Sequence, residues 1–212
     1  MINILIVDEQ ALVRTGLRHI LERQPGIAEI REVATGEKAL SLCRSFKPDL
    51  VLLDLNLPGM SAFEITCRLR RMSAQMGIII LAIHAKAPYP NRLLEAGASA
   101  YLTKDCASGE LIRAVRKVAA GERYIGEAAA KQLALSIFPG RAESPFERLS
   151  ARELEILQKL TEGNKVPEIA RLLSLSPKTV ATYKYRIYEK LGTRSEVGLL
   201  RMAMRHGLLE AV

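Results

Sequence analysis

The sequence has few cysteines and no long apolar run. Cys43, Cys67 and Cys106 are widely separated and no pair has the spacing of metal ligands, so neither a disulfide framework nor a zinc site is indicated. We interpret them as small buried hydrophobic side chains, with a redox sensor as the alternative. The longest apolar stretches, near residues 50–53 and 78–83, are far shorter than the ~20 residues that a membrane-spanning helix needs. We therefore expect no membrane partner.

We also expect no signal peptide. The apolar segment Ile4–Val7 is too short for one and continues directly into Asp8 and Glu9, so we expect a cytoplasmic protein. With 212 residues and an apolar content of 49%, the chain is long enough for one large domain or two modest ones with real cores.

The charge is unbalanced towards the basic side, with a formal net charge of +8. Residues 176–205 alone hold seven cations and two anions. This local density indicates a polyanionic partner, and a solvated basic face is the alternative interpretation.

Residues 1–120 alternate short apolar runs with segments of helical period, such as 12–21 and 111–118. Because the predicted strands are apolar on both faces, they indicate a doubly wound, five-stranded parallel sheet covered by helices on both sides, which is an α/β fold. The predicted strands are Ile2–Val7, Glu29–Val33, Leu50–Leu53, Ile78–Ile83 and Ala100–Leu102.

Residues 121–148 are predicted to form a linker with a helix at 127–138, because the following "PGRAESPFER" is rich in proline, glycine and charge. The second domain, 149–212, has no strand pattern and is predicted to be a small all-α bundle of four short helices. Ser150 and Glu153 fit a capping box at the first helix, and Ser176 with Pro177 begins the third.

Acidic residues follow two of the predicted strands. In a sheet of order 2-1-3-4-5, ligands bind beyond the carboxyl ends of strands 1 and 3, which here carry Asp8, Glu9 and Asp54. The fifth strand ends at Lys104. Clustered carboxylates favour a hard cation such as Mg²⁺, aspartate can accept a phosphoryl group, and a lysine can neutralise that group. The alternative is that Asp8 and Asp54 only cap the helices that follow.

Residues 1–120 resemble a response-regulator receiver domain, which is flavodoxin-like, through "ILIVDE", "PDLVLLDLNLPGMSAFE" and "GASAYLTK". This resemblance implies that Asp54 is the phosphoacceptor and that Lys104 contacts the phosphoryl group. It implies that Mg²⁺ is held by Asp8, Glu9, Asp54 and the backbone carbonyl of Asn56. It also places Tyr101 at the position of an aromatic residue that changes rotamer on activation.

Two residues depart from the receiver pattern. Ala82 stands where the family usually has Thr or Ser, and Glu9 stands where a second aspartate is usual. The lost hydroxyl removes a charge-assisted hydrogen bond worth roughly 1.5–3 kcal/mol. Our hypothesis is that Asp54 is phosphorylated but weakly coupled to the rest of the domain, and a phosphorylation-independent receiver is the alternative. We interpret His84 as a loop residue rather than a relay or metal ligand.

The predicted helix from Ser176 to Leu191 has two different faces. At 100° per residue, its apolar stripe faces the core of the bundle, and hydroxyls, a small residue and cations lie on or near the opposite side. Such a helix suits the major groove of DNA, with its N-terminal end near a phosphate. The apolar stripe consists of Val180, Tyr183, Ile187 and Leu191.

The second domain resembles the helix-turn-helix of the LuxR and NarL group through "SPKTV" and "KLG", and the whole chain resembles NarL/FixJ-type response regulators, closest to the GacA/UvrY type of global regulator. The resemblance implies double-stranded promoter DNA, a sensor histidine kinase and a homodimer on DNA as partners. The implied DNA contacts are Lys178, Thr179, Thr182, Lys184, Tyr185 and Arg186, while Ala181 departs from the usual polar residue. Dimer packing is implied for the last helix through Val197, Leu200 and Met204, although the methionines there equally suit the core.

Two other classes stay open at this point. A hydrolase of the haloacid dehalogenase type also uses an aspartate at a strand end with Mg²⁺, but it needs a second aspartate two residues later, where this chain has Asn56. The other class is a receiver that serves only as a protein-binding module. The function that we expect is instead that of a transcription factor, which is not an enzyme, and DNA binding distinguishes the two.

Overall fold

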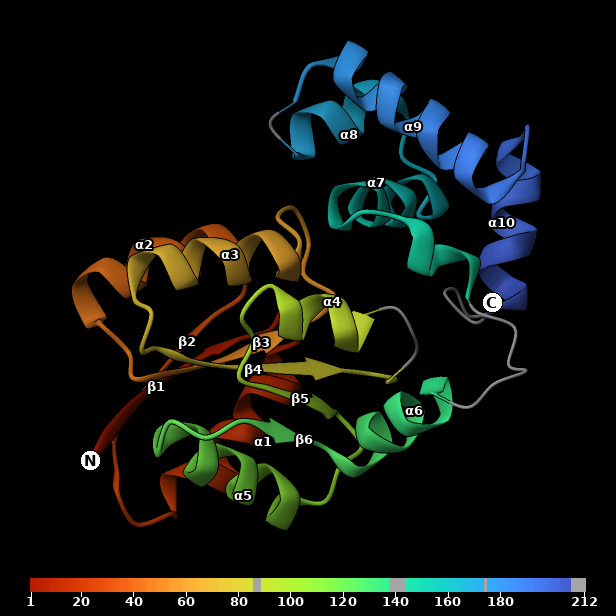
Figure 1. Ribbon diagram of the computed structural model, residues 1–212. Helices are drawn as coiled ribbons and strands as arrows, with labels where there is room; N and C mark the ends of the chain where they lie inside the picture. Colours follow the sequence, from red (N-terminus) through yellow and green to blue (C-terminus); the bar gives the residue numbers. More distant parts are fainter. Residues whose placement is uncertain (86–88, 138–143, 174, 207–212) are drawn as a thin grey trace. The chain divides into compact units, whose positions relative to one another are not determined.

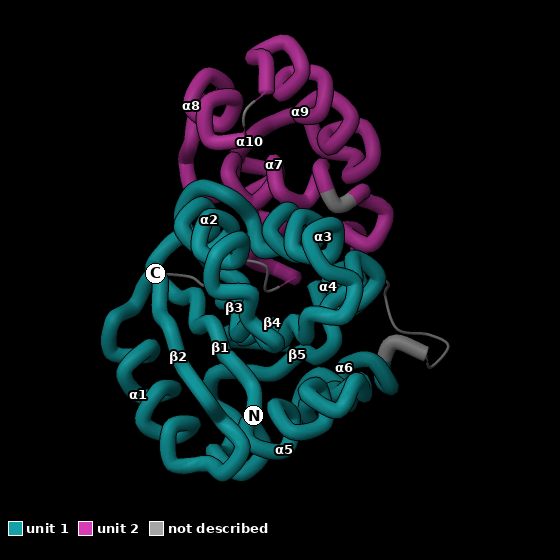
Figure 2. Tube along the Cα trace, turned by 90° about the vertical axis from the view of Figure 1, so that its left-hand side faces the viewer, with its two compact units in different colours: residues 1–85, 89–137 teal, residues 86–88, 138–212 magenta. Residues whose placement is uncertain are grey.

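The computed structural model describes residues 1–85, 89–137, 144–173 and 175–206. They form two compact units (Figure 2), the first made of residues 1–85 and 89–137 and the second of the described residues from 144 onwards. Within these described ranges, no helix combines the length and the apolarity that crossing a membrane requires.

The first unit is built on a parallel sheet with the strand order β2-β1-β3-β4-β5-β6 (Figure 1). The doubly wound topology and the predicted order of the first five strands are confirmed, but the prediction of five strands is corrected to six. The strands are β1 (Ile2–Val7), β2 (Ile27–Val33), β3 (Leu50–Asp54), β4 (Gly77–Ala82), β5 (Ala100–Thr103) and β6 (Tyr124–Ile125).

The sixth strand is only two residues long, so it leaves no alternating pattern by which the sequence would reveal it. Hydrogen bonds to the backbone of β5 hold it in place. The amide of Tyr124 donates to the carbonyl of Ser99 at 3.0 Å, and the amide of Gly126 donates to the carbonyl of Tyr101 at 2.9 Å. β6 therefore covers the edge of β5.

Helices cover both faces of the sheet (Figure 1). Along β1, Leu5 and Val7 pack with α2, α3 and α4, whereas Ile4 and Ile6 pack with α1 and α5, because alternate side chains of a strand point to opposite faces. The helices are α1 (Ala11–Glu22), α2 (Gly36–Phe46), α3 (Ala62–Met72), α4 (Tyr89–Glu95) and α5 (Ser108–Ala119).

Helix α6 (Glu127–Ile137) follows β6 and also belongs to the first unit. Its Ala129 is buried in the core beside α4, and the carboxylate of Glu110 on α5 accepts the amide of Glu127 at 2.8 Å. Residues 124–137, which the sequence placed in a linker, thus pack on the receiver-like unit. The predicted last residue of this helix, Phe138, lies outside the described residues.

The second unit is helical. A short 3-10 helix, η1, is followed by four α-helices, as predicted: η1 (Pro145–Arg148), α7 (Ala151–Thr161), α8 (Val166–Leu172), α9 (Pro177–Leu191) and α10 (Glu196–Arg205). The capping box of Ser150 and Glu153 forms at α7, and the side chain of Ser176 caps α9. Helix α9 ends at Leu191 and is capped by Gly192, which takes the left-handed conformation with a φ of 64°.

One acidic residue joins two helices of this bundle. Glu153 is almost fully buried at the start of α7, and its carboxylate contacts the ammonium of Lys190, near the end of α9, at 2.6 Å. The same carboxylate accepts the amide of Ser150 at 2.7 Å, so it serves as a helix cap and as an ion-pair partner. This double use fixes helix α9 on α7.

Candidate functional site

Two carboxylates and one ammonium meet at the carboxyl edge of the sheet. Asp8 directly follows β1, Asp54 ends β3 and Lys104 directly follows β5. The Lys104 ammonium lies 2.7 Å from Oδ2 of Asp8 and 3.1 Å from Oδ2 of Asp54. Both aspartates are only 1% exposed. Residues up to 96 positions apart in the sequence therefore form one buried, charged group, because parallel strands end at the same edge.

Backbone amides fix the other oxygen of each carboxylate. The amide of Gln10 donates to Oδ1 of Asp8 at 2.8 Å, and the amide of Asn56 donates to Oδ1 of Asp54 at 3.2 Å. The Oδ2 atom of Asp8 lies against the Lys104 ammonium, its ion-pair partner. The two Oδ2 atoms thus share a single positive charge.

The electrostatic balance of this group is unfavourable for two full negative charges. Burial, followed by repulsion from Asp8, raises the pKa of Asp54, while Lys104 and the Asn56 amide oppose the rise. Burial lowers the pKa of Lys104, but its hydrogen bonds and attraction to the two aspartates outweigh this effect and raise it overall. A further positive charge beside the aspartates would relieve the repulsion.

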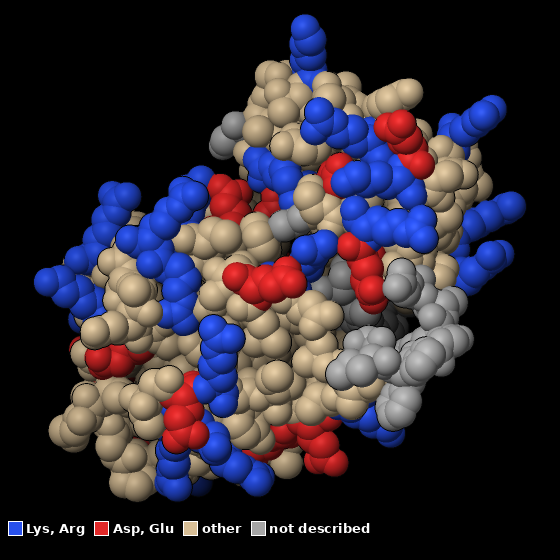
Figure 3. Space-filling model, in the orientation of Figure 1, with Lys and Arg blue, Asp and Glu red and all other residues tan. Residues whose placement is uncertain are grey.

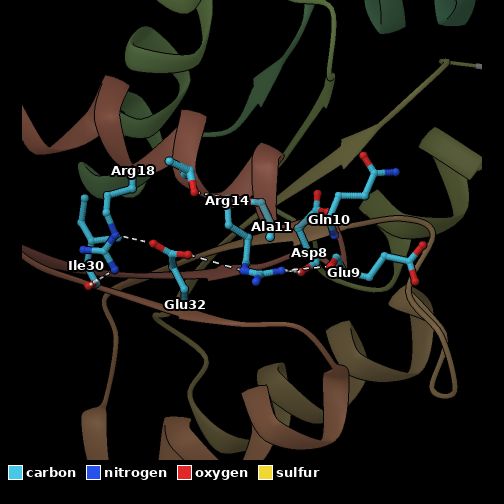
Figure 4. Close-up of polar contacts among 9 residues, drawn as sticks. Asp8, Glu9, Gln10, Ala11, Arg14, Arg18, Ile30 and Glu32 are labelled. Atoms are coloured by element: carbon cyan, nitrogen blue, oxygen red, sulfur yellow. Dashed lines mark hydrogen bonds and ion pairs between the residues drawn. The ribbon is translucent and has the colours of Figure 1, made fainter.

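Glu9 does not join this group. It is exposed, and its side chain extends away from the Arg14 guanidinium in Figure 4. Asp8 and Glu9 both lie beyond the last strand residue, Val7, and the chain bends at Glu9, so Asp8 is buried while Glu9 is exposed. Within the part of the chain that the structure describes, no three His, Cys, Asp or Glu side chains are grouped to hold a metal. The expected meeting of four side chains is thus corrected to three.

The oxygen donors that are present nevertheless suit Mg²⁺. Asp8 and Asp54 offer carboxylate oxygens with an excess of negative charge, and Asn56 follows Asp54 in the adjoining exposed loop. Mg²⁺ is commonly bound through one or two carboxylates while it keeps several waters, so a third carboxylate is not required. The donor set therefore fits this ion.

Ala82 and Tyr101, the two positions expected to couple phosphorylation to the rest of the domain, lie on β4 and β5. Ala82, the last residue of β4, is fully buried, and its carbonyl accepts the Lys104 amide at 2.7 Å. Tyr101 on β5 is also fully buried, and its hydroxyl donates to the carbonyl of His84 at 3.0 Å. Burial, with a smaller effect of Tyr89, raises the pKa of Tyr101. His84 is an exposed loop residue, as predicted.

Helix α9 presents a mixed polar surface. Lys178, Ala181, Thr182 and Arg186 are exposed, Tyr185 is 70% exposed, and Thr179 is half-buried. The opposite side is apolar, with Val180, Ile187 and Leu191 buried and Tyr183 half-buried. Lys and Arg side chains cover much of the visible face of the helical unit in Figure 3. The predicted division of α9 into an apolar and a polar face is confirmed.

Lys184 lies apart from this exposed surface. Its ammonium forms an ion pair with Glu196, the first residue of α10, and lies 5.7 Å from the centre of the Tyr188 ring. The hydrogen bond from Lys184 to Glu196 raises the pKa of this lysine although burial opposes the rise. The structure thus brings Lys184 to α10 rather than to the face that carries Tyr185.

Helix α10 leaves an apolar stripe open. Val197 is 60% exposed and Met204 is 48% exposed, and Leu200 between them is half-buried. Leu199 and Ala203, on the other side of the helix, are buried in the bundle. The three residues expected at a dimer contact therefore share one face, since positions i, i+3 and i+7 lie on the same side of a helix.

Sequence reasoning missed Arg14. Its guanidinium donates to the carbonyl of Asp8 at 2.7 Å and to that of Glu9 at 3.0 Å (Figure 4). The sequence shows only that Arg14 follows Glu9 by five positions, since side-chain bonds to backbone carbonyls leave no residue pattern.

Two buried carboxylates with a lysine at the edge of a doubly wound sheet, together with a helix-turn-helix unit, define a signal-receiving protein that carries its own DNA-binding domain. Comparison with known families agrees. A model of the response regulator receiver domain matches residues 4–116, and a model of bacterial regulatory proteins of the luxR family matches residues 147–203.

Similar proteins span the whole chain. The response regulator UvrY of Escherichia coli (strain K12) is 45% identical over 212 residues, covering 100% of this chain and 97% of UvrY. The response regulator GacA of Pseudomonas aeruginosa is 42% identical, covering 100% and 99%. RcsB of Salmonella enterica serovar Typhimurium, solved with promoter P1flhDC and the phosphomimetic BeF₃⁻, has a TM-score of 0.77 at 24% identity, covering 95% and 97%, and shows the fold alone.

The chain therefore belongs to the response regulators of two-component systems that join a receiver domain to a LuxR-type helix-turn-helix domain. Its function is that of a DNA-binding transcription regulator. The similar proteins are response regulators rather than hydrolases, and none of these findings supports the phosphorylation-independent alternative.

Proposed function

We propose that Asp54 accepts a phosphoryl group from a sensor histidine kinase. A carboxylate oxygen of Asp54 attacks the phosphorus, the bond from phosphorus to the kinase histidine breaks, and an acyl phosphate forms. The observation that carries this proposal is the Lys104 ammonium, which contacts the oxygens of both Asp8 and Asp54 and is placed to neutralise the incoming group.

Mg²⁺ would be held by Asp8, Asp54 and the backbone carbonyl of Asn56. When bound, the ion supplies positive charge that stabilises the transferring phosphoryl oxygens. The raised pKa of Asp54 supports this proposal, because the pair of aspartates lacks one positive charge.

The signal would leave the site through Tyr101. Its hydroxyl already contacts the carbonyl of His84 in the loop after β4, so a movement of that loop changes the partner of the tyrosine. Ala82 supplies no hydroxyl at the end of β4, and the coupling of phosphorylation to this movement is correspondingly weak.

DNA would be contacted by the exposed face of α9. Lys178 and Arg186 would bind phosphates, while Thr179, Ala181, Thr182 and Tyr185 would approach base edges in the major groove. Lys184 contributes to this contact only after exchanging Glu196 for a phosphate. The exposed stripe of Val197, Leu200 and Met204 would pair with its twin in a second copy on a pseudo-palindromic site.

Mass spectrometry tests the phosphoacceptor. The protein is incubated with Mg²⁺ and a small phosphodonor, and the mass gain of one phosphoryl group is expected. The Asp54→Asn variant should show no gain. A gain that persists in this variant, or no gain in the wild type, contradicts the assignment.

A gel-shift measurement with promoter fragments tests the DNA contact. Tyr185→Ala and Lys178→Ala should each weaken binding about tenfold or more, since a base or phosphate contact is worth roughly 1–3 kcal/mol. Lys131→Ala is the matched control, because Lys131 is an exposed cation on α6 of the other unit. If the wild type binds no DNA fragment, the receiver serves as a protein-binding module instead.

A further inference from the structure

Arg14 lies between the loop that carries the acids and strand β2 (Figure 4). One nitrogen of its guanidinium, Nη1, donates to the carbonyl of Asp8 at 2.7 Å and to the carbonyl of Glu9 at 3.0 Å. Its Nε lies 3.4 Å from the Glu32 carboxylate. A single, mostly buried side chain thus connects both residues of the acidic pair to the body of the sheet.

Glu32 is itself held in place from a second side. Arg18, one turn further along α1, forms an ion pair with Glu32 and donates to the carbonyl of Ile30 at 3.0 Å. The Glu32 carboxylate therefore lies between two guanidinium groups. Because a planar guanidinium binds in a fixed geometry, this arrangement fixes the direction from which Arg14 reaches the loop.

The two carbonyls that Arg14 contacts belong to Asp8 and Glu9 themselves. Fixing consecutive carbonyls fixes the backbone between them, and the amide of Gln10 adds a bond to Oδ1 of Asp8 at 2.8 Å. Together these bonds hold the Asp8 carboxylate towards Lys104 and Asp54 before any ion arrives. Ligands that are already oriented lose less freedom on binding, so the affinity for a metal rises.

We propose that Arg14 is a positioning residue that raises the affinity of the receiver for Mg²⁺ by fixing the backbone of Asp8 and Glu9. This inference rests on the proposed function, since it concerns the same acidic site. Arg14 contacts neither the phosphoryl group nor the ion, and acts only through the two carbonyls.

The charge of Arg14 alone would have the opposite effect and would lower the affinity for Mg²⁺. A cation near the acidic pair repels Mg²⁺, so loss of the charge without any loss of positioning would strengthen binding. Arg14→Met removes both the charge and the hydrogen bonds, whereas Arg14→Lys keeps the charge but cannot reach Glu32 and both carbonyls at once. The two variants together separate positioning from charge.

The test is a titration of the full chain with MgCl₂, in which the NMR chemical shift of the Asn56 amide reports Mg²⁺ binding. We expect about tenfold weaker Mg²⁺ binding for Arg14→Met, the size usual for a residue that orients metal ligands, and an intermediate loss for Arg14→Lys. Phosphorylation of Arg14→Met by a small phosphodonor should recover the wild-type rate at saturating Mg²⁺. Urea unfolding of each variant shows whether the fold is retained.

Arg18→Met is the matched control. It removes the other guanidinium from Glu32 but leaves both bonds from Arg14 to the loop, so it should weaken Mg²⁺ binding clearly less than Arg14→Met does. The inference is overturned if Arg14→Met binds Mg²⁺ as well as or better than the wild type, or if Arg18→Met weakens binding equally. If the wild type still gains mass at Asp54 in these cases, the proposed function stands without the inference. If the wild type neither binds Mg²⁺ nor gains mass, both fail.

Discussion

Restoring a hydroxyl at the end of β4 should strengthen the response of the protein to phosphorylation. Ala82 is fully buried, lies one position beyond Leu81, which pairs with Asp54, and accepts the Lys104 amide through its own carbonyl at 2.7 Å. In an Ala82→Thr variant, a hydroxyl would therefore stand on the strand between Asp54 and Lys104. It would become a donor for the phosphoryl group without any further change of sequence.

The size of the effect follows from the partner of that hydroxyl. A hydrogen bond to a charged group contributes about 1.5–3 kcal/mol, which corresponds to roughly a 10- to 150-fold change in an equilibrium constant. In the unphosphorylated protein the same hydroxyl enters a buried position, and an unsatisfied buried hydroxyl costs about 1–3 kcal/mol. Ala82→Thr should thus lower the stability of the resting protein and raise its affinity for a phosphoryl mimic.

The assay compares the binding of the phosphomimetic BeF₃⁻ in Mg²⁺ buffer for the wild type, Ala82→Thr and Ala82→Val. Valine has the shape of threonine without the hydroxyl, so steric effects are shared by the two variants. We expect at least tenfold tighter binding by the threonine variant than by the valine variant, and a larger gain in DNA affinity on adding BeF₃⁻. Equal affinities for threonine and valine would refute the reasoning, because the hydroxyl would then not reach the bound group.

Three further predictions concern Asp54, Glu153 and the apolar stripe of α10. Asp54→Asn should stabilise the Mg²⁺-free protein at neutral pH by about 1 kcal/mol in urea unfolding, because burial and Asp8 raise the pKa of this carboxyl and so disfavour its charged form in the fold; a loss of stability would contradict this. Burial raises the pKa of Glu153, but hydrogen bonds from Lys190 and Ser150 outweigh that effect and lower the pKa overall. The contribution of Glu153 to stability is therefore full above its pKa in the unfolded chain, and it is lost as the pH falls through its pKa in the folded protein. Glu153→Gln should therefore destabilise the helical unit by about 1–2 kcal/mol at neutral pH and weaken the dependence of its unfolding on acid, as followed by NMR of α9 amides. Val197→Asp should weaken the pairing of two copies on a two-site promoter fragment at least tenfold, as measured by gel shift. Binding of one copy to a half-site should stay unchanged. Equal losses on both fragments would exclude a dimer contact at this stripe.

The carboxyl edge of the sheet could be predicted from the sequence because its residues are fixed by strand ends. An apolar run that stops at Asp54 shows where β3 ends, and a parallel sheet then brings this residue to the ends of β1 and β5. The direction of a side chain just beyond the end of a strand could not be predicted in this way. Asp8 and Glu9 differ in direction because of the turn between them, which bonds to Gln10 and Arg14 determine, and no periodicity records such bonds.

The helical unit shows the same limit for charge. The dense cations of residues 176–205 indicated a polyanionic partner, which agrees with the match to a family of DNA-binding regulators, but a count of cations does not tell which of them are available. Of the four cations on α9, Lys184 contacts Glu196 and Lys190 contacts Glu153, which leaves Lys178 and Arg186 as the two exposed cations outside these ion pairs. Each phosphate contact contributes about 0.9 to the slope of log affinity against log salt concentration. A helix that uses only the two exposed cations would therefore contribute about half the slope that its composition suggests, and a full slope would mean that the internal ion pairs open on DNA.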